Sequence, residues 1–192
     1  MRMTNLPLAP EALFRPGGRL TGPPIQLPLF VDEQRLAPWV IRLHRSSFLR
    51  YDFRLQVCGA LASFVLLEVP SLDPDRPVTA EMVGNHDRKF MLSERVIKEG
   101  QYDAGPTMPV DTGVFAPLIR RYAVHDLEII DQLACGDLQL RLTGHYMKGG
   151  WRMTGRGTKW LLQKMPDEHA SATEVLKLDV SVVTGKRLDE LR

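Results

Sequence analysis

The sequence predicts a mainly β protein with a single core, built as a barrel or a sandwich. Three observations favour this fold class: short runs of alternating apolar and polar residues, Gly and Pro between those runs, and weak helical periodicity. The chain has 192 residues, 44% of them hydrophobic, and a formal net charge of +2. These values are typical of one globular domain and argue against a disordered chain or a charged tail protein.

An extended arm is expected at the start of the chain, over residues 1–30. Six of the fourteen prolines lie there, with three glycines among them, and this composition disfavours regular structure. The region lacks the uninterrupted apolar run of a secretory signal, and no stretch of 18 apolar residues occurs in the chain. We therefore expect a soluble, cytoplasmic protein with no membrane partner, in which Cys58 and Cys135 are reduced thiols.

The body of the chain, residues 31–172, is expected to consist mostly of strands. Period-two alternation predicts strands over 39–44 and 50–57, and the apolar run after Gly59 predicts a buried strand. Short helices are predicted over 94–99 and near the end of the tail, residues 173–192, where Thr184 is a suitable N-cap. The remaining predicted strands, including the one after Gly59, cover residues 61–67, 127–130, 138–142, 151–154 and 159–164.

The first two predicted strands separate apolar from polar side chains. If they pair as an antiparallel hairpin, their apolar residues lie on one face and five ionisable residues share the other. One interpretation is a solvated outer face, and the other is an anion site, since the planar fork of arginine donates two hydrogen bonds to a phosphate. The ionisable residues are Arg42, His44, Arg50, Asp52 and Arg54.

A second basic cluster lies between residues 138 and 166, where no carboxylate occurs. Cations interleaved with aromatic residues suit a nucleic-acid surface, because the cations offset phosphate charge and the rings stack on bases. The alternative is that the tryptophans lie in the core and the cations keep a strand face soluble, which we predict for Trp160. The cations are Arg141, Lys148, Arg152, Arg156, Lys159 and Lys164.

Several of these segments together resemble a known family. The runs HRSSFLRYDFRLQVCGALASF, VPSLDP, NH at 85–86, EGQYDAG at 99–105, GGWRM and WLLQK occur in this order between residues 39 and 170. They resemble the 3′-phosphoesterase domain of DNA ligase D. The resemblance implies a compact antiparallel β-barrel flanked by short helices. It also implies a manganese-dependent enzyme that acts on DNA 3′ ends of a primer-template in end joining, removing a terminal ribonucleoside and a 3′-phosphate.

The resemblance implies a Mn²⁺ site that this chain has altered. Two of the three ligand positions hold His44 and Asp52, but Arg50 stands where the family has its second histidine. An arginine offers no lone pair and stays charged in proteins. One unit charge ~4 Å from a divalent ion costs roughly 8 kcal/mol at an effective dielectric constant of ~20, before screening. We therefore expect weak Mn²⁺ binding.

The implied phosphate pocket is also altered. His86 matches a catalytic histidine, and Arg54 matches an arginine that contacts the phosphate. Other family positions have changed, and losing one donor to a charged transition state typically costs ~3–4 kcal/mol. The changed positions are Arg42 for a glutamine, Glu68 for a lysine, Val78 for an arginine with Arg76 nearby, and Phe90 for a tyrosine.

Three hypotheses follow from the sequence. The first is a weak or inactive phosphoesterase-like domain that binds 3′-phosphate ends through Arg42, Arg50 and Arg54 without a metal. The second is a working metal-dependent phosphoesterase that recruits His86 or a water in place of the missing ligand. The third is an interaction domain that docks on a DNA ligase or another end-joining protein. Under the first two, Arg76, Lys148, Arg152 and Lys159 are further candidates for contacts with phosphate or DNA.

Overall fold

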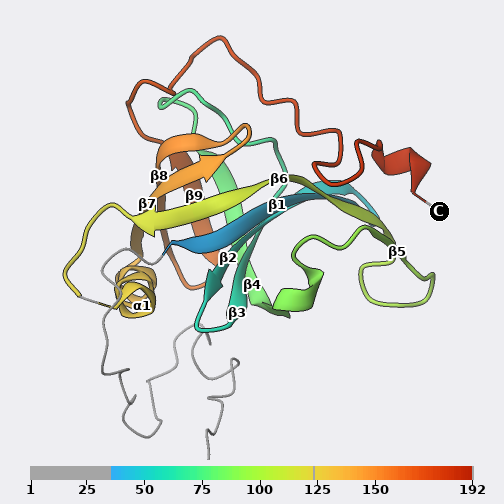
Figure 1. The fold of residues 1–192 in the computed structure, drawn as a ribbon, viewed down its shortest axis with the longest axis horizontal. Coiled ribbons are helices and arrows are strands. Elements are labelled where there is room, and N and C mark those ends of the chain that lie inside the picture. Colours follow the sequence, from blue (N-terminus) through green and yellow to red (C-terminus); the bar gives the residue numbers. More distant parts are fainter. Residues whose placement is uncertain (1–35, 123, 192) are drawn as a thin grey trace, which may run out of the picture.

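Eight antiparallel strands close into a barrel, and a ninth strand extends its wall (Figure 1). The structure is a computed structural model that describes residues 36–122 and 124–191, so the arm predicted over 1–30 lies outside the described residues. The strands are β1 (Ala37–Arg45), β2 (Leu49–Val57), β3 (Ala60–Leu66), β4 (Val78–Asp87), β5 (Arg95–Ile97), β6 (Gly105–Pro117), β7 (Asp137–Gly144), β8 (Lys148–Arg156) and β9 (Lys159–Lys164).

The strand order around the barrel is β1-β2-β3-β4-β9-β8-β7-β6, and the pairing of β6 with β1 closes it. Strand β5 pairs with the first residues of β6, beyond the closed wall. Full closure satisfies the backbone hydrogen bonds of each wall strand on both sides, which removes the exposed edges of an open sheet. The predicted antiparallel barrel is confirmed.

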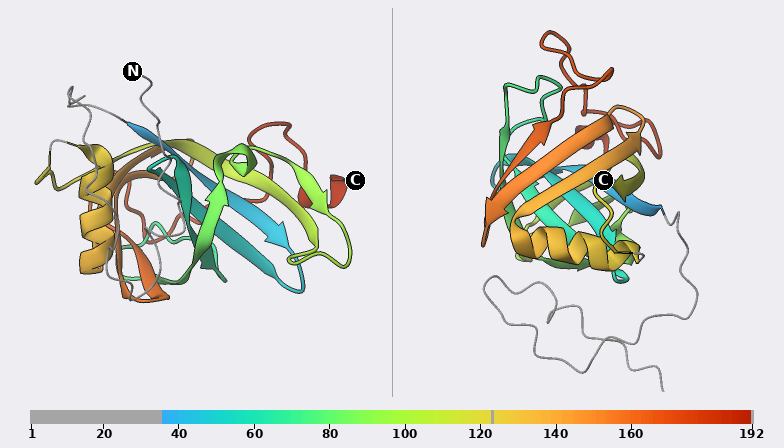
Figure 2. Two further views of the ribbon diagram at one scale, coloured as in Figure 1. Left: turned by 90° about the horizontal axis from the view of Figure 1, so that it is seen from below. Right: turned by 90° about the vertical axis from the view of Figure 1, so that its left-hand side faces the viewer.

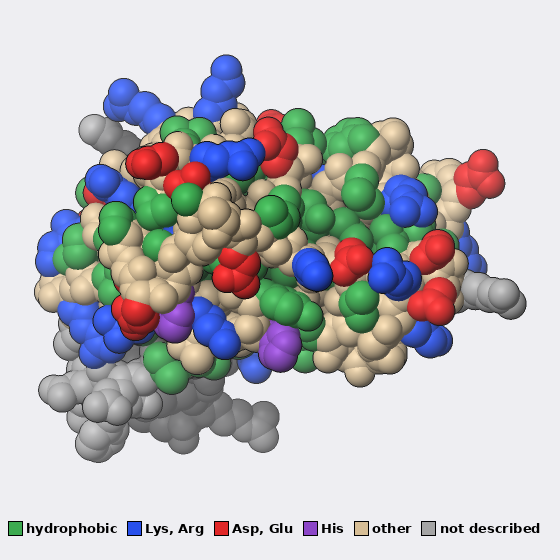
Figure 3. Space-filling model, turned by 90° about the horizontal axis from the view of Figure 1, so that it is seen from above, with side chains coloured by type: hydrophobic (Ala, Val, Ile, Leu, Met, Phe, Trp, Pro, Cys, Tyr) green, Lys and Arg blue, Asp and Glu red, His purple; other side chains and the backbone are tan. Residues whose placement is uncertain are grey.

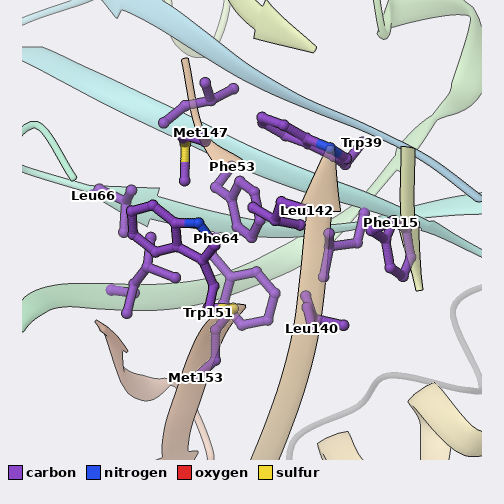
Figure 4. Close-up of a cluster of buried hydrophobic side chains, with 14 of the residues drawn as sticks. Trp39, Phe53, Phe64, Leu66, Phe115, Leu140, Leu142, Met147, Trp151 and Met153 are labelled. Carbon is purple, nitrogen blue, oxygen red and sulfur yellow. The ribbon is translucent and has the colours of Figure 1, made fainter. Parts of the chain in front are cut away.

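The core fills the barrel with the inward half of each strand. Trp39, Ile41 and Leu43 on β1 alternate with outward residues, as do Phe53 and Leu55 on β2, and all five are buried as the sequence predicts. Figure 4 shows aromatic and aliphatic side chains from β1, β2, β3, β6, β7 and β8 directed toward one another. Each such burial stabilises the fold by roughly 1.5–3 kcal/mol relative to leaving the side chain exposed.

Helix α1 (His125–Cys135) lies across one end of the barrel, and the β1–β2 turn lies toward the other end (Figure 2). The strand predicted over 127–130 is therefore wrong. Ile129 and Leu133 are buried one helical turn apart, and Gly136 ends the helix in a left-handed conformation with φ of 76°. The two adjacent isoleucines favour a strand locally, but packing of this face on the barrel decides the outcome.

Both predicted short helices also require correction. Residues 94–99 contain strand β5, whose Arg95 pairs with Thr107 of β6. Among the tail residues that the structure describes, 173–191, the one helical element is a short 3₁₀ turn, η3 (Leu188–Glu190), and its N-cap is Arg187 rather than Thr184. Strands β4 and β6 were not predicted from the sequence pattern. Gly84 and Asn85 in β4 are typical turn residues, and Pro106 and Pro109 interrupt the pattern of β6.

The tail packs on the barrel through a few apolar side chains. Leu176, Leu178 and Leu188 are buried and belong to the main hydrophobic core. The backbone N–H of Val182 also donates to the carbonyl of Pro109 in β6 at 3.0 Å. Within residues 36–122 and 124–191, none of the helices is both long and apolar enough to span a membrane.

Candidate functional site

Five ionisable side chains of β1 and β2 gather on the outer wall of the barrel. The hairpin register pairs Arg42 with Asp52 and His44 with Arg50, and Arg54 follows two residues further along β2. Directly opposite residues in an antiparallel pair share a face, and so do residues two apart in a strand. The predicted common polar face of this hairpin is therefore present.

These polar side chains are buried, although they face away from the core. Residues 88–104 fold back over the outer wall as a 3₁₀ turn, η2 (Arg88–Phe90), strand β5 and a loop. Met91 of this segment packs against Val40 and Leu61 in a second, small apolar cluster. The interpretation of a solvated outer face is therefore wrong: Arg42, His44, Arg50, Asp52 and Arg54 are each at most 8% exposed.

The guanidinium of Arg50 lies among the side chains of His44, Asp52 and Asp103. Its Nε donates to Asp52 Oδ1 at 3.1 Å, and one terminal nitrogen contacts His44 Nδ1 at 3.2 Å. Its two terminal nitrogens also donate to Asp103 Oδ1 and Oδ2 at 2.9 and 2.5 Å. Arg50 therefore occupies the space between the two retained ligand positions of the implied metal site.

The hydrogen bonds around His44 fix which of its ring nitrogens carries a proton. Nε2 lies 3.0 Å from the backbone carbonyl of Asp103, which can only accept, so Nε2 donates there. Nδ1 then accepts from Arg50. Burial would raise the pKa of Asp52, but the charges of Arg54 and Arg50 hold that pKa far below its usual range. Asp52 is thus a carboxylate at neutral pH.

A cleft of about 230 Å³ opens beside this cluster, between β2, β3, β4 and the 98–104 loop. Arg54 lines it and donates to Asp52 Oδ2 at 2.8 Å, while its buried Nε has no hydrogen-bond partner among the described residues. Burial and the charges of Arg95 and Arg50 lower the pKa of Arg54, against the raising influence of Asp52. An anion in this cleft would relieve that crowding of positive charge.

A β-bulge places His86 on the same wall. Ser63 pairs with Val83, but Leu61 pairs with His86, so β4 contains one extra residue at this point. Without that residue, alternation would turn His86 to the other face. The Ser63 hydroxyl donates to the Leu61 carbonyl, so His86 Nδ1, 2.9 Å from Ser63 Oγ, must be the donor in its own bond.

The protonation state of His86 follows from its surroundings. Burial and the positive charge of Arg54 lower its pKa to about 4. The ring is therefore neutral at pH 7. Because Nδ1 carries the proton, Nε2 has a free lone pair.

Arg42 has a separate role on the same wall. Its guanidinium donates to the carbonyls of Phe90, Met91 and Ser93 at 3.0, 2.9 and 2.6 Å, and to Thr107 Oγ1 at 3.2 Å. Burial lowers its pKa to about 9, so the group stays charged. These bonds fasten residues 88–104 to the barrel and leave Arg42 out of the cleft.

The other altered positions lie away from the cleft. Arg76 and Glu68 are exposed outside the strands, and Val78 is buried in the core at the start of β4. Eight residues of strand separate Val78 from His86, about 26 Å at ~3.3 Å per residue. The structure therefore does not bring Arg76 to His86. The Phe90 ring instead lies 4.0 Å below the Arg95 guanidinium.

The second basic cluster divides between surface and interior. Lys148, Arg152 and Lys159 are exposed on β8 and β9, in a part of the wall that does not border the cleft, and Arg152 is paired with Asp137 at 2.8 Å. Trp151 and Trp160 lie in the core, as predicted for Trp160. Figure 3 shows cationic and anionic side chains interspersed on the face that it presents.

Several residues that line the cleft were not assigned to the site from the sequence pattern, and Ser63, Tyr102 and Asp103 are three of them. A signal for Ser63 was available, because the two-residue turn Cys58–Gly59 sets the β2–β3 register that places Ser63 opposite Arg54. The sequence offered no comparable signal for Asp103. It lies in a loop, and only the folding of that loop over β1 and β2 brings it to Arg50.

The residues present do not fit a resident Mn²⁺ ion. The described residues contain no group of three or more His, Cys, Asp or Glu side chains arranged to hold a metal. His44 and Asp52 both remain, but the positively charged Arg50 lies at hydrogen-bonding distance from each of them. A divalent ion would need the same space and would meet a like charge there.

A cleft lined by histidine, aspartate and arginine side chains thus lies on the outer wall of the closed barrel. The family model described as the DNA Ligase D 3′-phosphoesterase domain matches residues 42–155, more than half of the chain, and the chain belongs to this family. It is also similar to the multifunctional non-homologous end joining protein LigD of Pseudomonas aeruginosa, with 29% identity over 148 residues. The similar region covers 74% of this chain and 17% of that protein.

Proposed function

We propose that this domain binds 3′-phosphorylated DNA ends in the cytoplasm during end joining, through Arg50 and Arg54 and without a bound metal. Under this proposal the domain has little or no phosphoesterase activity. The end-joining context comes from the family and from the name of the relative, of which this chain spans about a sixth. A DNA ligase or another end-joining protein is the expected partner.

The observation that carries the proposal is the position of the Arg50 guanidinium. It provides positive charge in the space where the family has its metal, and it bonds both retained ligand side chains. A guanidinium and a divalent ion both attract phosphate oxygens, but the guanidinium donates hydrogen bonds and does not activate water as a metal does. Replacing one by the other therefore preserves binding and removes the source of the nucleophile.

Arg54 and His86 complete the proposed phosphate site. Arg54 has a buried Nε without an acceptor among the described residues, and an unsatisfied buried donor costs roughly 1–3 kcal/mol. A phosphate oxygen in the cleft supplies an acceptor. His86 is neutral in the free protein, and the charge of a bound dianion would raise its pKa and favour its protonated, donating form.

Binding to a labelled primer-template tests the proposal. Fluorescence anisotropy in EDTA compares a 3′-phosphate end with a 3′-hydroxyl end. We expect the phosphate end to bind at least ~10-fold more tightly, because one charged hydrogen-bonding contact contributes roughly 1.5–3 kcal/mol. Arg54→Gln should abolish this preference. The matched control Arg141→Gln, an exposed arginine on β7, should retain it.

A parallel assay measures release of phosphate from the same end with excess Mn²⁺, using Asp52→Ala as control. Removal of phosphate that disappears in the control would show a working enzyme and overturn the metal-free proposal. Equal affinity for both ends would exclude the phosphate site. If Lys148, Arg152 and Lys159 are all replaced by Gln without loss of DNA binding, the second basic cluster is not the DNA surface.

A further inference from the structure

The 98–104 loop, between β5 and β6, places a carboxylate on the proposed phosphate site. Both oxygens of Asp103 accept from the two terminal nitrogens of Arg50, at 2.9 and 2.5 Å. Among the described residues, this carboxylate is hydrogen-bonded to Arg50. The Asp103 side chain is 24% exposed. The contact therefore lies at the mouth of the cleft, where a ligand would enter.

The geometry of this contact is the one that arginine uses for phosphate. Two parallel N–H groups facing two oxygens form the bidentate pair common to carboxylates and phosphates. The remaining Arg50 contacts are to Asp52 and His44, deeper in the site, and to the Ser46 hydroxyl at 3.5 Å. A phosphate cannot take two hydrogen bonds from the terminal nitrogens of Arg50 unless Asp103 leaves them.

Few side chains hold Asp103 over the cleft. Its φ is +61°, in the left-handed region, which aspartate and asparagine adopt more readily than other residues except glycine. The described side-chain contacts that hold this residue are the Arg50 pair and the bond from His44 to the Asp103 carbonyl. The pairing of Ile97 with Gly105 anchors the two ends of the loop, and the two side chains that hold Asp103 also border the site.

We propose that Asp103 is a specificity-determining residue: it is an internal anion that a DNA end must displace from Arg50. This inference rests on the proposed function. A terminal phosphate monoester carries close to two negative charges and three free oxygens, so it can bind Arg50 and Arg54 together. An internal phosphodiester carries one charge, as the carboxylate does, and gains little by replacing it. Asp103 thus selects ends over internal backbone.

Asp103→Asn tests this inference, because asparagine has nearly the same size, tolerates the left-handed region and lacks the charge. Anisotropy measures affinity for a 3′-phosphate end, for a 3′-hydroxyl end and for a circular single strand, which offers internal phosphodiesters alone. Gln101→Ala is the matched control, since Gln101 is an exposed residue of the same loop, does not line the cleft and leaves the Asp103 pair intact. Thermal unfolding confirms that each variant is folded.

We expect Asp103→Asn to bind the phosphate end ~10-fold more tightly, as removal of a competing ion pair should allow. We also expect binding of the circular strand to strengthen by a larger factor, so that selectivity for the end falls. The Gln101→Ala control should stay within about twofold of the unsubstituted protein.

Unchanged or weaker binding of the phosphate end by Asp103→Asn would overturn the inference. The proposed function would still stand if the unsubstituted chain prefers the phosphate end. A preference for the phosphate end that emerges only in Asp103→Asn would mean that Asp103 blocks the site rather than selects ends, and it would overturn the inference. No preference in either protein would overturn both proposals.

Discussion

Replacing Arg50 by histidine should convert the proposed phosphate site into a metal site. The substitution removes the guanidinium from between His44 and Asp52 and adds an imidazole at the position where the family has its second histidine. The barrel core does not change, because Arg50 faces outward from β2. We expect Arg50→His to bind Mn²⁺ and the unsubstituted protein to bind it weakly.

The magnitude follows from the charge that is removed. A guanidinium that stayed ~4 Å from a divalent ion would oppose it by roughly 8 kcal/mol at an effective dielectric constant of ~20. If only a third of this remains after screening, about 2.7 kcal/mol, removal of the charge strengthens Mn²⁺ binding about 100-fold. The added ligand should strengthen it further.

The measurement is the loss of the free Mn²⁺ electron paramagnetic resonance signal on titration with protein. Arg50→Gln removes the charge without adding a ligand, and Arg50→His combined with Asp52→Ala removes one carboxylate ligand. Arg50→His should bind more tightly than both controls. The reasoning is refuted if the unsubstituted protein binds Mn²⁺ as tightly as Arg50→His and loses that binding in Asp52→Ala.

Two further predictions concern stability. The pKa of His86 is about 4 in the folded chain against an ordinary value of 6.5, so the unfolded chain takes up the proton first and stability falls as pH decreases from 6.5 to 4. Because the ring is half-buried, we expect the free energy of unfolding, measured in urea, to fall by about 1–2 kcal/mol over this pH range. His86→Asn should largely remove this pH dependence. An equal fall in that variant would contradict the assignment to His86. Gly105 has a φ of +133°, and an added Cβ would overlap the carbonyl oxygen of Arg45, so Gly105→Ala should destabilise the chain by ~2 kcal/mol or more. Gly100→Ala, at φ +82° in open space, should cost only about 1 kcal/mol, and equal costs would show that the Arg45 contact is unimportant.

The first two strands show what sequence alone could predict of the site. Alternation over 39–44 and 50–57 correctly separated the core residues from the polar face, because a period of two leaves little freedom in a paired hairpin. Burial of the polar face could not be predicted in this way. It depends on residues 88–104, which fold over the hairpin through Met91 and the bonds of Arg42.

Elements that depend on tertiary contacts were the ones missed. Residues 127–130 form part of a helix because one face of it packs on the barrel, although the local residues favour a strand. The position of His86 depends on one extra residue in β4, where Gly84 and Asn85 both lie opposite Ala62, and a glycine inside a strand is the signal that could have marked this bulge. Asp103 joins the site only because its loop lies across Arg50.

Because the site faces outward, the residues that pack the barrel core differ from the residues that determine the chemistry of the site. In β1 and β2, the buried inward side chains pack in the barrel core, and the polar cluster lies on the outward face. A change of chemistry at positions 42, 44, 50, 52 or 54 therefore needs no repacking of the core. The barrel core can therefore stay the same while the side chains of this outer cluster change.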